Sequence, residues 1–334
     1  MTKTIQLAHG GGGRLSSQLI DEEIVSRFGD GPLRTLPDAA LLPNHGSKII
    51  FSTDSYVVNP LMFPGGNIGN LAVHGTVNDV SVAGGRPLWL SLGLILEEGL
   101  SIEILRTILD TIKKTAEECN VKIVTGDTKV VAKGQCDGIY INTAGIGEAL
   151  EKFNLDKNNI IPGDSVLVSG TIGDHGMAVL AAREGINIEN GPVSDTASVH
   201  KLVKIAHEFG EDVRFMRDPT RGGVASVLNE IAAGTDIGFK LKSESIPLSR
   251  GTGSISEIMG IDPLNVACEG RMLLVCNSNS ADKILERWKQ IPEGREAAII
   301  GKATSVAERV ELLTVTGGTR LIDVPQGELL PRIC

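Results

Sequence analysis

The chain of 334 residues has few aromatic side chains, no cluster of basic residues and no long apolar run. Phe, Trp and Tyr together make up 3% of the residues, so a core must be built mainly from Leu, Ile, Val and Ala. The formal net charge of −9 argues against nucleic-acid binding, which needs clustered Lys and Arg. No apolar stretch approaches the roughly 20 residues of a membrane span, and residues 1–7 lack the apolar segment of a signal peptide. We therefore expect a cytoplasmic protein with no nucleic-acid or membrane partner.

The five cysteines do not form a recognisable disulfide or zinc framework. Their number is odd, and none belongs to a Cys-x-x-Cys pair. Cys119 lies late in a helical pattern and Cys276 ends an apolar run, which predicts two buried thiols. Cys334 is different, because at the end of the sequence it contributes nothing to a core. A frayed terminus is the commoner interpretation of such a residue, and a reactive thiol is the alternative.

The familiar nucleotide-binding motifs are also absent. The glycine cluster at 10–13 continues into Arg14, so it is not a P-loop. Gly65 and Gly66, followed by Asn67, do not match the dinucleotide-binding fingerprint. A glycine loop that opens a helix can still present N–H groups to a phosphate. A tight turn is an equally good interpretation of both loops.

Length and the order of elements predict two layered domains. A chain of 334 residues suits two domains of roughly 100–200 residues each. Strand and helix patterns are mixed in both halves, which predicts an α+β or layered α/β fold. The polar stretch at 151–159 lacks periodicity, so we expect domains at 1–155 and 156–322. Residues 323–334 are rich in Pro and Gly and predict a flexible tail, which spans roughly 35–40 Å when extended.

Several carboxylates lie beside predicted strand ends, glycine turns or a predicted helix at 67–84. Open sheets hold ligands at strand ends, and Mg²⁺ binds nucleotides through one or two carboxylates plus phosphates. For any one of these residues alone, an ordinary turn is the better interpretation. Together they suggest a metal and phosphate site; they are Asp54, Asp79, Asp127, Asp174 and Asp218.

Three further features are open to two interpretations. Asn67, Asn70, His74 and Asn78 share one face of the predicted helix, which predicts either a ligand groove or a solvated face. A Lys such as Lys129, beside a carboxylate, can neutralise phosphate or move a proton, but a surface lysine is the commoner case. Glu269, which lies among small residues in the segment at 267–271, can act as a base or be a half-exposed turn residue.

Segments spread over the whole chain resemble the HypE family of hydrogenase maturation factors. This family is part of the aminoimidazole ribonucleotide synthetase (PurM-like) superfamily, which includes selenophosphate synthetase and thiamine phosphate kinase. The terminal sequence PRIC is specific to the family, whereas the Asp-bearing turns are shared with the superfamily. The other segments are LAHG at 7–10, FSTDSY at 51–56, FPGGNIG at 63–69, NDV at 78–80, VTGDTK at 124–129 and RDPTRGG at 217–223.

The resemblance implies a PurM-like fold of two domains and an ATP-dependent activity. The N-terminal domain would carry a mixed sheet or half-barrel that pairs with a second copy in a homodimer, with ATP near that interface. The C-terminal domain would be α/β. The carbamoyltransferase HypF would deliver a carbamoyl group to Cys334, and the chain would dehydrate this thiocarboxamide to a thiocyanate. The cyanide would then pass to iron on the HypC–HypD complex during maturation of [NiFe]-hydrogenase.

The resemblance also implies roles for individual residues. Lys129 and Glu269 are the candidates for proton transfer, and His9 with its glycine cluster would close over the phosphates. Metal ligands, for Mg²⁺, would be Asp54, Asp79 and Asp127. The residues that would hold ATP are Asp54, Asp79, Asp127, Asp218, Asn67, Gly65 and Gly66, and the catalytic set is Cys334, Lys129, Glu269 and His9.

Two rival functions remain open. One is a kinase or synthetase of the same superfamily that acts on a diffusible small molecule. A reactive Cys near the N-terminus is typical of selenophosphate synthetase, and here the first cysteine is Cys119, which argues against that member. The other is a carrier without catalytic activity that only presents Cys334.

Overall fold

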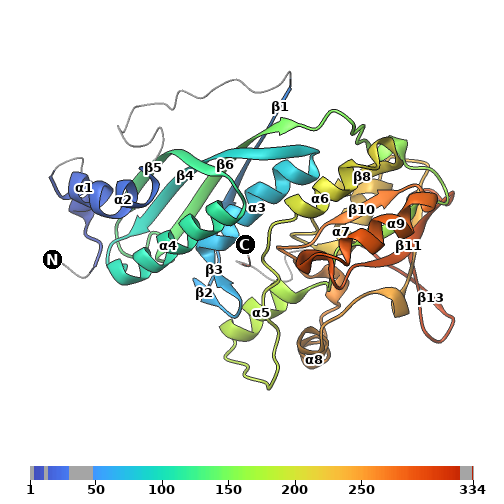
Figure 1. Ribbon diagram of the computed structural model, residues 1–334. Coiled ribbons are helices and arrows are strands. Elements are labelled where there is room, and N and C mark those ends of the chain that lie inside the picture. The colour runs from blue at the N-terminus through green and yellow to red at the C-terminus, as the bar shows by residue number, and fades with distance from the viewer. Residues whose placement is uncertain (1–3, 11–13, 30–47, 324–332, 334) are drawn as a thin grey trace.

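The computed structural model describes residues 4–10, 14–29, 48–323 and 333, and these form two large sheets with helices packed on them and one small two-stranded sheet (Figure 1). The first sheet has four strands in the order β1-β6-β4-β5, and the second has seven in the order β13-β12-β9-β11-β7-β10-β8. Within the described residues, no helix is long and apolar enough to cross a membrane. Mixed sheets and helices in both parts confirm the predicted α+β class.

The elements of the first part come before residue 150. The hairpin of β2 (Met62–Phe63) and β3 (Gly66–Asn67) leads directly into α3. The remaining elements are η1 (Leu7–Gly10), α1 (Arg14–Leu19), η2 (Ile20–Val25), α2 (Ser26–Phe28), β1 (Ile49–Tyr56), α3 (Ile68–Val82), β4 (Gly85–Glu97), α4 (Ile102–Glu118), β5 (Lys122–Val131) and β6 (Ile139–Ala149).

The second part contains the longer sheet and five α-helices. Its strands are β7 (Ser165–Val168), β8 (Val213–Arg217), β9 (Gly238–Lys242), β10 (Leu273–Cys276), β11 (Ala298–Thr304), β12 (Val310–Leu313) and β13 (Thr319–Leu321). Its helices are α5 (Asp174–Arg183), α6 (His200–His207), α7 (Gly223–Ala232), α8 (Arg250–Met259) and α9 (Ser278–Trp288), joined by short 3₁₀ turns. The predicted domain boundary at 155 falls between the last strand of the first sheet and the first strand of the second.

Helices α3 and α4 cover one face of the four-stranded sheet (Figure 1). Ser101 caps α4, and the buried residues of this helix recur with helical spacing, as the sequence predicts. The opposite face carries exposed apolar side chains, because alternate residues of β1 and β4 point away from α3. These side chains include Ile49, Phe51 and Ile95.

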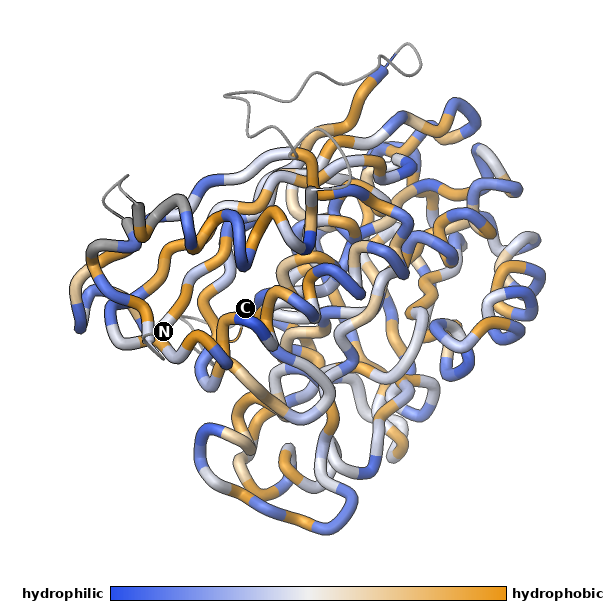
Figure 2. The backbone as a smooth tube through the Cα atoms, turned by 60° about the vertical axis from the view of Figure 1, so that its left-hand side comes forward, coloured by the Kyte–Doolittle hydropathy of each residue, from blue (hydrophilic) through white to orange (hydrophobic). Residues whose placement is uncertain are grey.

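The seven-stranded sheet is covered on both faces. Val166 and Val168 of β7 pack in the cluster that contains α7, whereas Leu167 packs in the cluster that contains α6 and α9. Both faces of the central strands are therefore buried. Figure 2 shows hydrophobic and hydrophilic stretches alternating along the coloured backbone.

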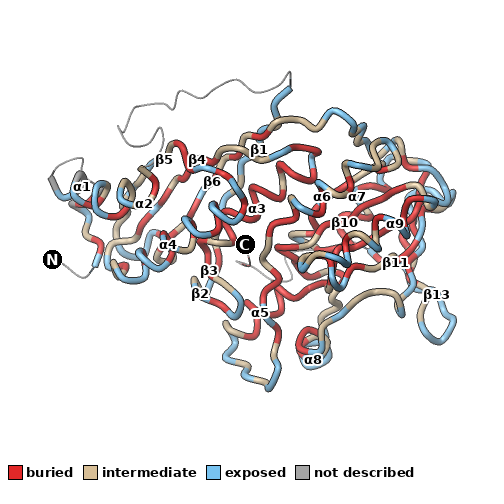
Figure 3. The backbone as a smooth tube through the Cα atoms, in the orientation of Figure 1, coloured by how far each residue is buried: buried red, intermediate tan, exposed pale blue. Residues whose placement is uncertain are grey.

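Helix α3 is buried along nearly its whole length and lies beside the second part of the chain (Figure 3). Asn67 caps it by accepting a hydrogen bond from the N–H of Gly69 at 2.7 Å, and the Asn70 side chain accepts from the N–H of Asn67 at 2.9 Å. The helix predicted at 67–84 is therefore confirmed.

Two strands are longer than the sequence indicates. Strand β1 continues to Tyr56 and β5 continues to Val131, so Asp54 and Asp127 lie inside strands. The expectation that both follow a strand end is wrong. In β5 the reason is Gly126, because a Cβ at this position would lie 2.3 Å from the carbonyl oxygen of Leu92 on β4. This glycine permits close strand pairing and does not form a turn.

Candidate functional site

Three of the predicted carboxylates lie together where the two parts of the chain meet. Asp54 lies on β1 opposite Thr143, whose hydroxyl donates to the carbonyl of Ala72 in α3, so Asp54 is on the α3 side of the sheet. Asp79 lies on α3, and its Oδ2 accepts a hydrogen bond from Ser52 Oγ at 2.7 Å. Asp218 directly follows β8. Ser52, on the same face of β1 as Asp54, contacts Asp79, and Arg221, three residues after Asp218, reaches Asp54, so the three carboxylates lie around one site.

Burial and mutual repulsion shape the charge of this site. Burial raises the pKa of Asp79, and the neighbouring charge of Asp54 raises it further, against the hydrogen bond from Ser52. Burial also raises the pKa of Asp218 to about 7, with Asp79 as the next cause. The nearby cations are Arg217, which lowers both pKa values, and Arg221, whose Nη2 lies 4.0 Å from Asp54 Oδ1.

This arrangement fits a divalent cation. Buried carboxylates that repel one another are stabilised when a cation stands between them, and oxygen ligands are those that Mg²⁺ prefers. The described residues contain no group of three or more His, Cys, Asp or Glu side chains placed to hold a metal ion by themselves. Mg²⁺ bound with a nucleotide commonly takes one or two carboxylates and completes its shell with phosphate and water oxygens.

Asp127 and Lys129 lie on the opposite face of the first sheet. They pair with Gly93 and Ile95 of β4, and the intervening Leu94 points into the core beneath α3 and α4. The structure therefore does not bring Asp127 together with the other two predicted metal ligands within one chain. Lys129 is exposed on the same open face, far from the α3 side of the sheet.

Glu269 is buried against the first part of the chain. Its N–H donates to Asp195 Oδ1 at 3.1 Å, and its carbonyl accepts from Asn78 Nδ2 at 3.3 Å. Its negative charge contributes to the raised pKa of Tyr56, so its carboxylate lies near that ring. A base candidate between the domains is therefore held by its backbone on both sides.

An ion-pair network supports this backbone. Arg271 Nε lies 3.4 Å from Asp195 Oδ2, and its Nη2 lies 3.9 Å from Asp174 Oδ2. Burial raises the pKa of Asp195 to about 6, although Arg271 opposes this shift. A Cβ at Gly270 would lie 1.8 Å from the carbonyl oxygen of Asp195, so only glycine fits between the two segments.

Two members of the polar stripe of α3, His74 and Asn78, are buried against the second part of the chain, so a solvated face does not describe them. His74 Nδ1 lies 3.0 Å from Thr196 Oγ1, and Asn78 Nδ2 donates to the carbonyl of Ala197 at 3.0 Å. Asn78 Oδ1 also accepts from the N–H of Val199 at 2.8 Å. These side chains attach the segment 196–199 of the second part to α3.

The glycine loop before α3 has a structural role. Gly65 has φ +94°, and a Cβ there would lie 2.8 Å from the carbonyl oxygen of Ser194. The N–H of Ser194 donates to the carbonyl of Pro64 at 2.8 Å. Asn67 is engaged as the α3 cap and donates to Thr111 Oγ1 at 2.9 Å. The predicted phosphate-binding role of Gly65, Gly66 and Asn67 stays a prediction beside these observed contacts.

The end of the chain lies in the same region. Cys334 is outside the described residues, but Ile333, to which it is bonded, is 3% exposed and belongs to the core cluster of the first part. His175 Nε2 lies 2.8 Å from the carbonyl oxygen of Ile333. The ring of His175 packs edge-on against Phe63, with centroids 5.3 Å apart.

His175, Ser194, Asp195 and Arg271 were not among the predicted site residues. Two sequence signals lie near them: the glycine turn at 170–176 contains His175, and the segment at 267–271, noted for its Glu, ends at Arg271. Their neighbours come from distant segments, so no local motif marks them.

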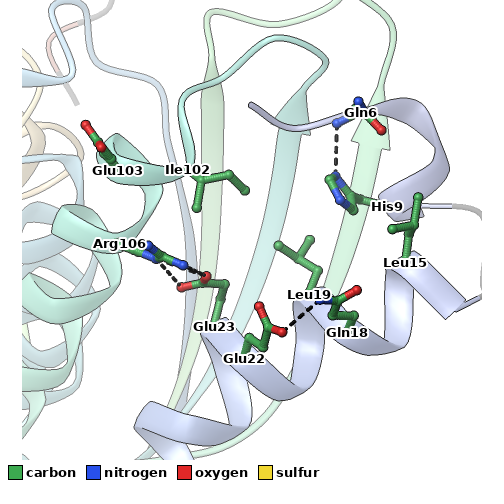
Figure 4. A pocket seen from close by; sticks show the side chains of 10 residues that line it. All are labelled: Gln6, His9, Leu15, Gln18, Leu19, Glu22, Glu23, Ile102, Glu103 and Arg106. Carbon is green, nitrogen blue, oxygen red and sulfur yellow. Dashed lines mark hydrogen bonds and ion pairs between the residues drawn. The ribbon is translucent and has the colours of Figure 1, made fainter. Parts of the chain in front are cut away.

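His9 lies in a separate pocket (Figure 4). Its Nδ1 accepts from the N–H of Gln6 at 3.0 Å. The pocket has a volume of about 570 Å³ and lies between the N-terminal helices and α4, where Arg106 pairs with Glu23 at 2.8 Å. The described residues do not connect His9 with the carboxylates on the α3 side of the sheet.

Two family descriptions match the chain, one for each part. AIR synthase related protein, N-terminal domain, matches residues 37–149, and AIR synthase related protein, C-terminal domain, matches residues 162–312. The carbamoyl dehydratase HypE of Rhizobium leguminosarum bv. viciae is 45% identical over 332 residues, which cover 99% of this chain and 95% of that protein.

Solved structures agree. The hydrogenase maturation protein HypE in complex with ATP has a TM-score of 0.95 and 42% identity, and covers 99% of this chain and 100% of its own. A chain of a HypE–HypF complex has a TM-score of 0.81 and 45% identity, and covers 92% and 99%. The fold is thus PurM-like with two domains, and the chain belongs to the HypE family of carbamoyl dehydratases.

Proposed function

We propose that this chain is an ATP-dependent carbamoyl dehydratase that acts on its own Cys334. HypF delivers the carbamoyl group, and the product thiocyanate supplies the cyanide ligand of the [NiFe]-hydrogenase iron through the HypC–HypD complex. The net reaction converts the thiocarboxamide and ATP into the thiocyanate, ADP, phosphate and a proton. The reaction takes place in the cytoplasm.

One observation carries this proposal. The carbonyl of Ile333, one residue before Cys334, is bonded to His175 at 2.8 Å in the region between the domains. A frayed terminus would leave Ile333 exposed, whereas it is buried. The buried position of Ile333 agrees with a substrate group that is brought to a fixed site, and argues against a carrier that only presents its thiol to partners.

The chemistry follows from the groups around this region. Mg-ATP supplies a phosphoryl group, which turns the amide oxygen into a phosphate leaving group. One or two of Asp54, Asp79 and Asp218 would hold the cation, and phosphate and water oxygens would complete its coordination. Glu269 takes a proton from the carbamoyl nitrogen, since its carboxylate is buried beside Tyr56 and its backbone is held on both sides. A closed site would keep water away from the reacting carbon.

The open face of the first sheet supports a homodimer. Ile49 and Phe51 are 65% and 63% exposed on this face, and a second copy would cover them. Asp127 and Lys129 lie on the same face, so a dimer places them at an interface where ATP contacts both copies. A place at this interface would account for the family motif that contains Asp127 and Lys129, although neither residue belongs to the Asp54–Asp79–Asp218 cluster.

Intact mass tests the reaction. The chain is incubated with HypF, carbamoyl phosphate and Mg-ATP, and we expect a gain of one carbamoyl group followed by the loss of one water. Cys334→Ala is expected to show neither change, while Cys276→Ala, which alters a buried thiol, shows both. A modification that persists on Cys334→Ala would refute the proposal.

ATP turnover separates the enzyme from a carrier. Asp79→Asn removes a charge from the carboxylate cluster and keeps the acceptor for Ser52. We expect ATP hydrolysis on the carbamoylated chain to fall at least a hundredfold, as removal of a preorganised charge does in other enzymes. Hydrolysis that is independent of this residue would contradict the assigned phosphate site.

A further inference from the structure

The hydrogen bonds of His175 determine which ring nitrogen carries the proton. The carbonyl oxygen of Ile333 only accepts hydrogen bonds, so Nε2 must donate to it. Burial lowers the pKa of His175 to about 4, which makes the ring neutral at neutral pH. Nδ1 is therefore an acceptor, and the Ser194 hydroxyl, 2.8 Å away, donates to it.

Ser194 is in turn held in a single orientation. Its Oγ accepts a hydrogen bond from the N–H of Thr196 at 3.2 Å, which leaves the hydroxyl proton for His175. Thr196 is fixed to the first domain by His74 of α3 at 3.0 Å. The result is a continuous chain of hydrogen bonds from α3, through the 194–196 segment and α5, to Ile333. We call the predicted tail at 323–334, to which Ile333 belongs, the arm.

The loop at 63–65 completes the pocket around this ring. Phe63 packs against the edge of His175, and Pro64 accepts a hydrogen bond from the N–H of Ser194. Gly65 lets the two backbones approach, because a Cβ would lie 2.8 Å from the carbonyl of Ser194. We define the arm seat as Phe63, Pro64, Gly65, His175 and Ser194.

We propose that His175 is the positioning residue for the carbamoyl-bearing arm, and that the 63–65 loop supports this seat. The catalytic consequence of this inference rests on the proposed function, whereas the docking of Ile333 does not depend on it. The contact that His175 makes is with the backbone carbonyl of Ile333. It holds the backbone one residue before Cys334, which restricts where the reacting carbon can lie relative to Glu269.

Alkylation of Cys334 measures the docked fraction directly. The other four cysteines are buried, and burial raises the pKa of each of their thiols, so they react slowly with iodoacetamide. The rate at Cys334 is followed by intact mass on the full chain without ATP. An arm that leaves its seat more often is alkylated faster.

Two amide substitutions at His175 distinguish the effect of losing the hydrogen bond from the effect of losing the packed ring. His175→Gln places an N–H near the position of Nε2, and His175→Asn places its amide near Nδ1 and cannot reach Ile333. We expect His175→Asn to raise the alkylation rate about tenfold, the effect of losing one buried hydrogen bond, and His175→Gln to stay within about threefold of the native chain. Equal rates in the two variants, whether raised or native, would overturn the proposal.

Ser194→Ala provides an independent variant if either amide fails to fold. It removes the donor to Nδ1 and leaves Nε2 able to donate, so we expect a rise of about threefold in alkylation. Alkylation of the buried cysteines reports unfolding in any variant. A native rate in folded Ser194→Ala would show that the ring orientation does not determine docking.

The catalytic consequence is read separately. In His175→Asn the carbamoyl group is expected to arrive from HypF at the native rate, while the loss of water slows about tenfold with an unchanged KM for ATP. If the native chain never loses water, the proposed function fails while the alkylation result still stands. If alkylation responds but dehydration does not, His175 docks the arm without positioning the reaction, and the proposal is refuted in that part.

Discussion

Gly75 of α3 provides a sharp test of the packing beneath the first sheet. A Cβ at this position would lie 2.3 Å from the hydroxyl of Tyr56 and 3.0 Å from two carbons of its ring. Tyr56 is 1% exposed, and its hydroxyl lies 3.2 Å from Thr76 Oγ1. Gly75→Ala therefore forces the ring of Tyr56 to move and breaks this hydrogen bond.

The expected magnitude is the difference between opposing effects. Overpacking a buried site costs about 1–3 kcal/mol, and the lost hydrogen bond costs about 1 kcal/mol. Alanine gains about 1 kcal/mol over glycine inside a helix. We expect Gly75→Ala to lower the free energy of unfolding by about 2 kcal/mol. Tyr56→Phe should cost about 1 kcal/mol.

The double variant isolates the clash with the hydroxyl. Without this oxygen the nearest contacts are 3.0 Å, which a shift of a few tenths of an ångström relieves. We expect Gly75→Ala with Tyr56→Phe to be no less stable than Tyr56→Phe alone, which corresponds to a favourable coupling of about 2 kcal/mol. The chain has two tryptophans, Trp89 on β4 and Trp288 on α9. A Trp288→Phe background therefore makes fluorescence report urea unfolding of the first domain.

Additive effects would refute this reasoning. If the two substitutions sum to within about 0.5 kcal/mol, the hydroxyl is not what excludes a side chain at Gly75. A stable Gly75→Ala variant would lead to the same conclusion. The Trp288→Phe chain without further change is the reference for all three variants.

Two further predictions concern the second domain and its contact with the first. The pKa of Asp195 is raised to about 6, so the folded chain binds more protons than the unfolded chain between about pH 4 and 6. The free energy of unfolding of the native chain relative to Asp195→Asn should therefore fall by up to about 3 kcal/mol as pH rises through this window, and level off above it. A difference that grows with pH would show that the ion pair with Arg271 outweighs the effect of burial. Gly65→Ala and Gly99→Ala both place alanine at positive φ, but nothing lies within 4 Å of a Cβ at Gly99, whereas Ser194 obstructs one at Gly65. Thermal unfolding should show Gly65→Ala to be less stable by about 1–3 kcal/mol more than Gly99→Ala, and equal losses would mean that the Ser194 contact is of no consequence.

Local features of the fold could be predicted because local sequence encodes them. Helix α4 follows from the Ser101 cap and the spacing of its apolar residues, and the end of α3 follows from the glycine stop at Gly84 and Gly85. Cys276 ends an apolar run and is buried in β10. Each of these properties depends on residues within about one helix or strand.

The arrangement of the site could be predicted only in part. Asp54, Asp79 and Asp218 do meet, but Asp127 lies on the other face of the sheet. Which face of the sheet each residue of β5 occupies depends on the parallel pairing of β5 with β4. This pairing shifts register between Leu90 and Ser91, and no pattern within residues 122–131 reveals that shift. The arm seat joins segments that are far apart in sequence, so only the folded chain identifies it.

The side chain of Asn78 joins three backbone groups of the second domain to one helix of the first. It bonds to Ala197, Val199 and the carbonyl of Glu269. A rotation of one domain against the other would therefore displace the proposed base and the segment that orients His175 at the same time. Any such rotation would therefore be thermodynamically linked to binding of the segment at Ile333. A ligand that favoured one orientation of the domains would change the affinity for that segment by the same free energy.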